Sequence, residues 1–189
     1  ITEAVINGIG FTVSVFRFRG SETVAERIER DGPLPPFKAV SIICDILDGL
    51  ETLHGAPELL VHNGISHHTV SLDYASGSEN PVLFGFDNLR SIHDSRDSID
   101  RSRISVFHAA PELSVGVITP KGDIYSVGAL LFHMIWGLPP WYSERIAKSS
   151  TDDAFRLLAD ARRRPLNFGP VSNFEVQTEF IIAIQRALS

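Results

Sequence analysis

The chain has 189 residues, of which 43% are hydrophobic and 21% are charged, and its formal net charge at pH 7 is −6. This length fits one domain or one large lobe of a two-lobed protein, and the acidic balance argues against nucleic-acid binding, which usually needs a basic surface. The only cysteine, Cys44, excludes an internal disulfide and a cysteine-rich zinc site. A single thiol is compatible with a reducing compartment, so we expect an intracellular location.

The first third of the chain alternates short β-like runs with helices. The segments Ala4–Ile9 and Phe11–Phe18 have the composition of strands, and Ser21–Arg30 is expected to form a short helix. A long amphipathic helix follows over Phe37–His54, in which Cys44 is expected to be a small core residue. Apolar residues spaced by three or four predict its buried stripe: Val40, Ile43, Leu47, Leu50 and Leu53.

The middle of the chain is dominated by turns, short strands and a polar loop. Asn63-Gly64 suits a turn with positive φ, and Val70–Leu72 and Val82–Phe86 are predicted to be short strands. The stretch Asp87–Ile104 has no apolar period and is expected to be a mobile loop. Two amphipathic helices are predicted near the end of the chain, Thr151–Ala161 and Asn173–Leu188.

The most apolar stretch, Ile124–Trp136, predicts a helix that is buried on every side. It is shorter than the roughly 20 apolar residues that span a bilayer, so no membrane span is predicted. Asp123 is expected to cap the start of this helix, and Gly137 and Pro139-Pro140 are expected to end it. Asp123 is also the only charge in the segment, and a buried carboxylate needs hydrogen-bond donors from elsewhere in the fold.

Five pieces stand in a recognisable order along the chain. They are Gly49–His54, Val61–Ile65, Leu83–Asp87, Ala110-Pro111-Glu112 and the central helix. In this order and spacing the chain resembles the large, C-terminal lobe of the protein kinase fold. The resemblance implies a mainly α fold with short β-strands, a helical bundle around one central buried helix, and small-lobe elements mostly missing. Residues 1–19 would then be a remnant of small-lobe strands and hinge, and residues 20–189 would be the C-terminal lobe.

The residues that pack this fold are present on that resemblance. His62 stands at the histidine of the His-Arg-Asp catalytic loop, and Phe86 stands at the phenylalanine of Asp-Phe-Gly. Ala110, Pro111 and Glu112 stand at the Ala-Pro-Glu motif, although the arginine that usually pairs with this Glu has no counterpart up to the last residue. Two members of the central helix complete the structural set, Asp123 and Gly128.

The residues that carry the chemistry of the family are absent. The catalytic aspartate falls on Gly64, the lysine two residues later on Ser66, and the metal-binding asparagine on Thr69. The metal-binding aspartate of Asp-Phe-Gly falls on Gly85, and the arginine of His-Arg-Asp falls on Asn63. Phosphoryl transfer depends on positioning and on metal-held charge, so a chain with these replacements is expected to be a pseudokinase with no catalytic residue, cofactor or metal.

The function that follows is a catalytically inactive kinase-like domain that serves as a protein-interaction scaffold or structural subunit, with a protein partner. One alternative is a nucleotide-responsive switch that binds ATP without Mg²⁺. Another is an active kinase with displaced catalytic residues, for which Asp87 is the nearest candidate. On a strand Asp87 would face the same side as Gly85 but lie about 6.6 Å away, so it would need a rearranged loop to replace a metal ligand.

Histidines and serines offer two further readings of the polar segments. His62 is expected to be structural, and His67 and His68 are expected to be solvent-exposed, because no carboxylate or thiol lies at a spacing that would complete a metal site. A flexible polar loop or a phosphorylated loop would each account for the arginine-rich stretch with five serines: Ser91, Ser95, Ser98, Ser102 and Ser105.

Apolar surface is expected where a C-terminal lobe lacks its partner lobe. The candidates are Val70, Leu72 and the strand Phe11–Phe18, and such a patch calls for a cover. Near the end of the central helix, Trp136 is expected to pack in the core, whereas Trp141 fits the core and a docking patch equally well.

Overall fold

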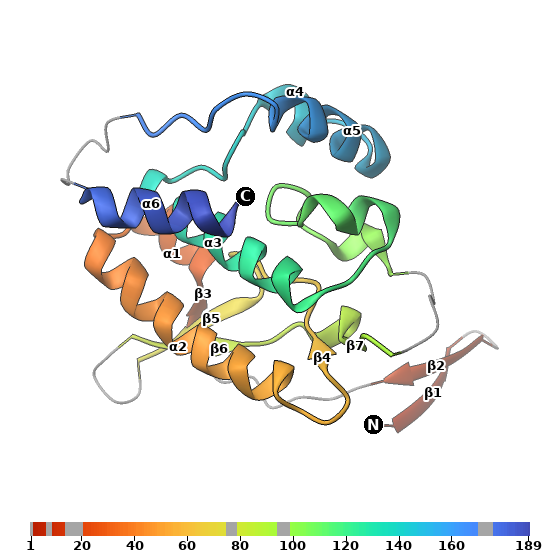
Figure 1. Ribbon diagram of the computed structural model, residues 1–189. Helices are drawn as coiled ribbons and strands as arrows, with labels where there is room; N and C mark the ends of the chain where they lie inside the picture. Colours follow the sequence, from red (N-terminus) through yellow and green to blue (C-terminus); the bar gives the residue numbers. More distant parts are fainter. Residues whose placement is uncertain (1, 7–8, 14–20, 75–78, 94–98, 170–175) are drawn as a thin grey trace.

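The protein is predominantly helical, with a few short antiparallel strands (Figure 1). The computed structural model describes residues 2–6, 9–13, 21–74, 79–93, 99–169 and 176–189. The helices are α1 (Val24–Asp31), α2 (Pro36–His54), α3 (Pro120–Trp136), α4 (Glu144–Ala147), α5 (Thr151–Ala161) and α6 (Thr178–Ala187), with the 3-10 helices η1 (Phe86–Asn88), η2 (Arg101–Arg103) and η3 (Pro111–Val115). The strands are β1 (Thr2–Ile6), β2 (Ile9–Val13), β3 (Glu22–Thr23), β4 (Leu60–Val61), β5 (Val70–Asp73), β6 (Asn80–Leu83) and β7 (Arg90–Ser91). The mainly α architecture predicted from the sequence is confirmed.

Helix α3 lies at the centre of the fold and contacts both α2 and α6 (Figure 1). It begins four residues earlier than predicted, because Pro120 suits the first turn and the hydroxyl of Thr119 accepts a hydrogen bond from the N–H of Gly122 at 3.1 Å. The prediction that Asp123 caps this helix was therefore wrong. The predicted end is confirmed, since Gly137 adopts φ 77° at the C-terminus.

Helix α2 exists as predicted but buries a different face. Only Ile43 and Leu50 of the predicted stripe are fully buried, and Cys44 is exposed, so its assignment to the core was wrong. The buried face consists of the residues that meet the core formed with α3: Ala39, Ile42, Ile43, Ile46 and Leu50. Two neighbouring faces of α2 are apolar, and the position of its neighbours decides which of them is covered.

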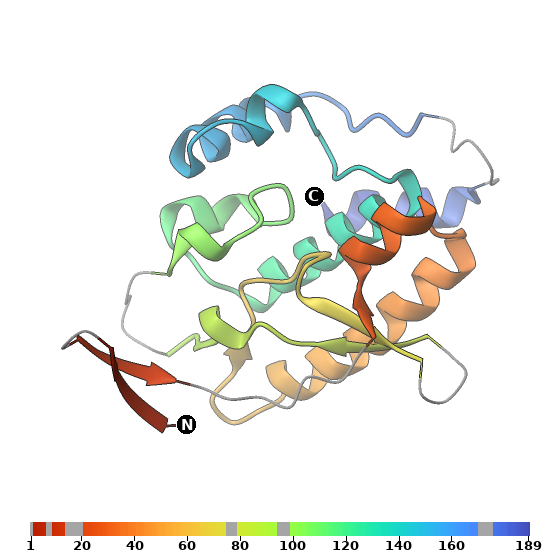
Figure 2. The same ribbon diagram turned by 180° about the vertical axis from the view of Figure 1, so that it is seen from behind.

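The strands form three small antiparallel sheets, β1-β2, β3-β5-β6 and β4-β7. The three-stranded sheet lies against α2, whereas the β1-β2 hairpin stands apart from the helices (Figures 1 and 2). Val70 and Leu72 on the central strand β5 are fully buried in the same core as α2 and α3. The expectation that these two residues form exposed apolar surface was therefore wrong.

The segment after β6 departs most from the prediction. Strand β6 ends at Leu83, before the predicted end at Phe86, because Gly85 adopts the left-handed φ of 78° and the chain then enters η1. Asp87 consequently lies on a 3-10 turn and not on a strand. The expected loop over Asp87–Ile104 contains η1, β7 and η2.

The last third contains α5, at its predicted bounds, and α4, which the sequence did not predict (Figure 1). Helix α6 begins at Thr178, and the first three residues of its predicted range, 173–175, lie outside the described residues. The end of the predicted strand Phe11–Phe18 also lies outside them, as do Ser95 and Ser98. None of the described helices combines the length and apolar character that crossing a membrane needs.

Helices α3 and α6 approach so closely that only glycine fits at Gly128. A Cβ at this position would lie 2.5 Å from the Cβ of Ala187, well inside van der Waals contact. The absence of a side chain at Gly128 therefore lets α6 cover the central helix.

We predict that Gly128→Ala lowers the free energy of unfolding by about 1–3 kcal/mol, because the added methyl group must push α6 away. The matched control is Gly49→Ala, since Gly49 lies in α2 and a Cβ there meets nothing within 4 Å. The control should raise stability by up to about 1 kcal/mol through helix propensity. Urea unfolding of both variants measures the difference, and equal effects of the two substitutions would contradict the close packing of α6.

Candidate functional site

The buried carboxylate of Asp123 joins α3 to the loop that follows β4. Its Oδ2 accepts a hydrogen bond from the backbone N–H of His62 at 2.8 Å, and its Oδ1 accepts one from the N–H of Asn63 at 2.9 Å. The Nε2 of His54, at the end of α2, lies 2.9 Å from Oδ2. Asp123 is 1% exposed, so these partners from two other elements provide the donors that a buried carboxylate needs.

Asn63 holds the same loop from its other side. It adopts φ 57°, in the left-handed region that asparagine tolerates, so the turn predicted at Asn63-Gly64 is made by the asparagine. Its side-chain amide donates hydrogen bonds to the carbonyl oxygens of Val61 and Asn88, both at 3.1 Å. Where the kinase resemblance expects a charged arginine, this chain has a buried amide that ties the loop to η1.

Thr69 closes the loop by contacts with the glycine and serine that precede it. Its hydroxyl donates to the carbonyl oxygen of Gly64 at 2.9 Å and accepts from the backbone N–H of Ser66 at 2.8 Å. The carbonyl oxygen of Thr69 also accepts from the N–H of Phe84 at 3.0 Å. The three positions named from the sequence, Gly64, Ser66 and Thr69, therefore form one hydrogen-bonded loop.

Gly85 faces this loop across a very short distance. A Cβ on Gly85 would lie 2.8 Å from the Cγ2 of Thr69. The backbone of Gly85 also has a φ of 78°, which is strained for any residue that carries a side chain. A Cβ on Gly64, by contrast, would have ordinary contacts, the nearest being 3.6 Å from the Nδ1 of His62. Thr69 thus fills the space that a side chain at position 85 would need.

His62 lies buried at the centre of this arrangement. Its side chain is fully buried, its Nε2 lies 3.1 Å from the carbonyl oxygen of Phe84, and its ring centre lies 5.0 Å from that of Phe86. Burial lowers the pKa of His62, and the nearby charge of Asp123 opposes this shift. The imidazole is therefore held neutral between the loop and the segment that follows β6.

Asp87 points away from this arrangement. Its carboxylate is 58% exposed and its Oδ1 lies 3.1 Å from the Nη1 of Arg103. The strand geometry expected for Asp87 was wrong, since a left-handed residue and a 3-10 turn intervene. Its carboxylate thus serves a surface ion pair with Arg103 in this structure.

The Ala110-Pro111-Glu112 segment is held by Arg162, at the C-terminus of α5. The Nη2 of Arg162 donates to the carbonyl oxygen of Ala109 at 2.6 Å, and its guanidinium lies 5.0 Å from the ring centre of Tyr125 on α3. Burial lowers the pKa of Arg162, while the carboxylate of Glu112 opposes that shift. Glu112 itself accepts a hydrogen bond from the hydroxyl of Thr119 at 3.3 Å.

Sequence reasoning missed three residues of this region: His54, Asn88 and Arg162. Each binds a partner far away in the chain. His54 ends one of the pieces that carry the kinase resemblance, without an expected role of its own, and Asn88 and Arg162 belong to no motif. A signal for His54 was its place at the end of an amphipathic helix, where a polar residue often meets the next element. The other two have no comparable signal.

Comparison with known proteins relates the chain to protein kinases. It is 26% identical over 135 residues to the serine/threonine-protein kinase PknB of Mycobacterium leprae, a match that covers 69% of this chain and 21% of that kinase. It is 28% identical over 159 residues to the rust resistance kinase Lr10 of Triticum aestivum, covering 70% of this chain and 24% of that protein. It is 29% identical over 133 residues to mitogen-activated protein kinase kinase kinase 8 of Rattus norvegicus, a match that covers 70% of this chain and 27% of that kinase.

These matches are distant, and the chain spans about a quarter of the length of the curated relatives it matches. No model of a protein family matches the sequence. The relatives nevertheless support a protein kinase-like domain, in agreement with the order of motifs and with the mainly helical fold built around α3.

We predict that acid destabilises the protein in part through His62. The pKa of His62 in the folded protein lies below its ordinary value of 6.5, so below that pH the unfolded chain takes up a proton that the folded chain does not. The free energy of unfolding should then fall on acidification by up to about 1.4 kcal/mol per pH unit from this side chain.

Urea unfolding between pH 7 and pH 5 measures this dependence. His62→Gln does not titrate and should show a shallower slope than the parent. His93→Gln, which removes an exposed histidine, should keep the parent slope. If the free energy of unfolding depended on pH equally in the parent and in His62→Gln, His62 would not contribute to the acid destabilisation.

Proposed function

We propose that this protein kinase-like domain is catalytically inactive and acts as a protein-interaction scaffold or structural subunit. The observation that carries the proposal is the contact between Gly85 and Thr69. Where the kinase resemblance expects an aspartate and an asparagine that hold metal ions, a left-handed glycine faces a threonine that leaves no room for a side chain. Both the backbone conformation of Gly85 and the side chain of Thr69 therefore oppose an aspartate at position 85.

The hydrogen bonds of the loop support the same conclusion. Mg²⁺ requires oxygen ligands in near-octahedral geometry, and kinases place it with carboxylate and amide side chains. Here the hydroxyl of Thr69 is occupied by Gly64 and Ser66 within its own loop. Gly64 offers no side chain that accepts a proton from a substrate hydroxyl.

Asp87 is a poor substitute for the missing ligands. Replacing a metal-binding aspartate would require its carboxylate to turn inward and give up Arg103, with which it forms an exposed ion pair. An exposed pair contributes about 0–1 kcal/mol, so the pair alone would not prevent this turn. The barrier is the left-handed backbone at Gly85, which turns the chain after β6 and sets the direction of the 3-10 turn that carries Asp87.

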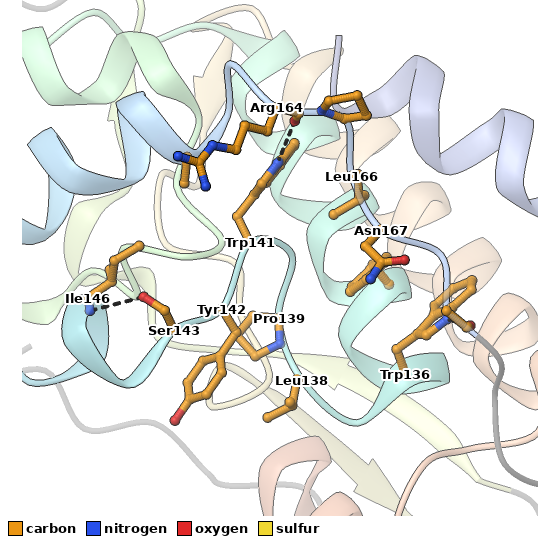
Figure 3. A pocket seen from close by; sticks show the side chains of 14 residues that line it. Trp136, Leu138, Pro139, Trp141, Tyr142, Ser143, Ile146, Arg164, Leu166 and Asn167 are labelled. Atoms are coloured by element: carbon orange, nitrogen blue, oxygen red, sulfur yellow. Dashed lines mark hydrogen bonds between the residues drawn. The ribbon is translucent and has the colours of Figure 1, made fainter.

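An apolar groove beside the end of α3 suits a partner (Figure 3). Its volume is about 560 Å³. The groove is lined mainly by aromatic and aliphatic side chains, among them Trp136, Leu138, Trp141, Tyr142 and Leu166. Leu138 and Tyr142 are 51% and 40% exposed, so apolar surface is available to a bound molecule.

The two tryptophans of the groove are held in place before any partner arrives. The indole N–H of Trp141 donates to the carbonyl oxygen of Arg164 at 3.1 Å, and that of Trp136 donates to the carbonyl oxygen of Gly169 at 2.9 Å. Trp136 also stacks on Phe132, with ring centres 4.7 Å apart. Rigid aromatic side chains lower the entropy cost of binding, which favours this groove as a docking surface.

The chemistry of the partner follows from the charges beside the groove. Two exposed arginines, Arg163 and Arg164, follow α5, and Arg164 lines the groove itself. This basic edge stands out in a chain with a net charge of −6. We therefore expect the partner to present an apolar segment flanked by acidic residues.

The proposal predicts that neither ATP nor ADP, with or without Mg²⁺, shifts the thermal unfolding of the full-length protein. A ligand at 100 times its Kd would add about 2.7 kcal/mol to the free energy of unfolding, which is readily measured. A shift without Mg²⁺ would contradict the scaffold and favour a nucleotide switch. A shift that depends on Mg²⁺ would favour an active site with displaced residues.

Two variants make this test sharper. Gly64→Asp should fold, because a Cβ there meets only ordinary contacts, and it should still show no phosphoryl transfer. Gly85→Asp should lose stability, because its side chain meets Thr69. Phosphoryl transfer by Gly64→Asp would mean that the metal ligands are present after all.

For the groove, we predict that peptides selected from a random display library for binding to the protein carry an apolar residue flanked by Asp or Glu. Both tryptophans of the chain line the groove, so their fluorescence reports binding directly. Leu138→Asp should weaken binding at least tenfold. Val115→Asp, at an exposed apolar residue outside the groove, is the control. Equal binding by Leu138→Asp and the parent would remove the groove from the proposal.

A further inference from the structure

Three histidines from separate parts of the chain meet at the end of the loop after β4. His67 lies in the loop after β4, His108 lies just before η3, and His133 lies in the last turn of α3. One ring nitrogen from each lies within 4.8 Å of the other two. Among the described residues this is the only group of three or more potential metal ligands at such distances.

The two inner histidines are already arranged as a pair of ligands. The Nδ1 of His133 lies 3.2 Å from the Nε2 of His108, and both side chains are buried. Two nitrogens bound at 2.0–2.1 Å to a tetrahedral zinc ion are separated by about 3.3 Å. The separation of the pair therefore matches that of two nitrogens on one zinc ion, and the nitrogen of His67, within 4.8 Å, would move closer on binding.

The other nitrogen of His108 has the support that metal-binding histidines usually have. Ser105 Oγ lies 2.8 Å from the Nδ1 of His108, which fixes the ring and leaves Nε2 facing His133. A hydrogen bond on the second ring nitrogen is the usual outer contact of a metal-bound imidazole.

His67 completes the group from the surface side. Its ring centre lies 4.4 Å from that of His133 and 5.0 Å from that of His108. Its Nδ1 is buried and has no hydrogen-bond partner among the described residues. Its backbone is held in place, since its carbonyl oxygen accepts a hydrogen bond from the N–H of Ala25 in α1 at 2.8 Å. An expectation of solvent exposure for His67 was thus only half right.

We propose that His67, His108 and His133 bind one transition-metal ion, of which Zn²⁺ is the most suitable. Imidazole nitrogens suit zinc and its neighbours in the first transition series, whereas Mg²⁺ and Ca²⁺ require oxygen ligands. Water would occupy the fourth position. His68, whose ring lies 3.9 Å from that of His67, is the nearest further imidazole.

The environment favours the form of histidine that binds metals. Burial lowers the pKa of His67 to about 3 and that of His133 to about 4, so both rings are neutral at pH 7. No proton then has to be displaced by the metal beyond the one shared in the His108–His133 hydrogen bond.

The consequence would be a link between three parts of the fold. The ion would join the loop that carries Gly64 and Thr69, the segment that leads into η3, and the central helix α3. Such a link stabilises the fold and is independent of whether the domain transfers phosphate. The inference therefore stands or falls separately from the proposed lack of activity.

The test is a zinc titration of the chelator-treated full-length protein, in competition with a chromophoric chelator. We expect one Zn²⁺ per chain, with binding at least tenfold weaker in His67→Gln and in His133→Gln. His67→Gln is the safer variant because His67 is only partly buried, and circular dichroism confirms that each variant folds. The control is His93→Gln, which removes an exposed histidine outside the group and should leave affinity unchanged.

Cobalt gives a second measurement that does not depend on stability. Co²⁺ bound by three imidazoles and water in a tetrahedral site should give strong visible absorption, and zinc should abolish it. Weak absorption typical of octahedral cobalt would overturn the proposal. Equal zinc affinity of the parent and His67→Gln would overturn it as well, and would mean that the histidines only pack together.

Discussion

The carboxylate of Asp123 is the interaction on which the candidate site depends. A charge buried this deeply is costly unless donors surround it, and three do: two backbone N–H groups of the loop after β4 and the imidazole of His54. These bonds hold the loop against α3. Thr69 and His67 both lie on that loop, so their positions depend on the same contacts.

Residues that pack this site and residues that would perform chemistry in it obey different physical requirements. His62 and Phe86 fill space, and His62 also pairs with the carbonyl oxygen of Phe84, so their removal would leave cavities and an unpaired atom. A catalytic aspartate or metal ligand must instead point an unpaired acceptor into an open site. At Gly85 and Thr69 the chain has closed that space with a methyl group and a left-handed turn.

Several features were predictable because they depend on neighbours in the chain. The end of α3 at Gly137 follows from the ease with which glycine adopts positive φ, and the bounds of α5 follow from a periodic apolar pattern. The face of α2 was not predictable in the same way. Cys44 and Ile42 both lie on an apolar helix, and only the position of α3 makes one exposed and the other buried.

The amino-acid sequence by itself determined the kinase-like order of motifs, the glycines where carboxylates are expected, and the central apolar helix. Only the tertiary structure decided that Thr119 caps α3, that Arg162 holds the segment before η3, and that three distant histidines meet. The physical reason is the range of the interactions. Caps, turns and periodicity act over a few residues, whereas a buried polar group takes whichever partner the packing of the whole chain brings within hydrogen-bond distance.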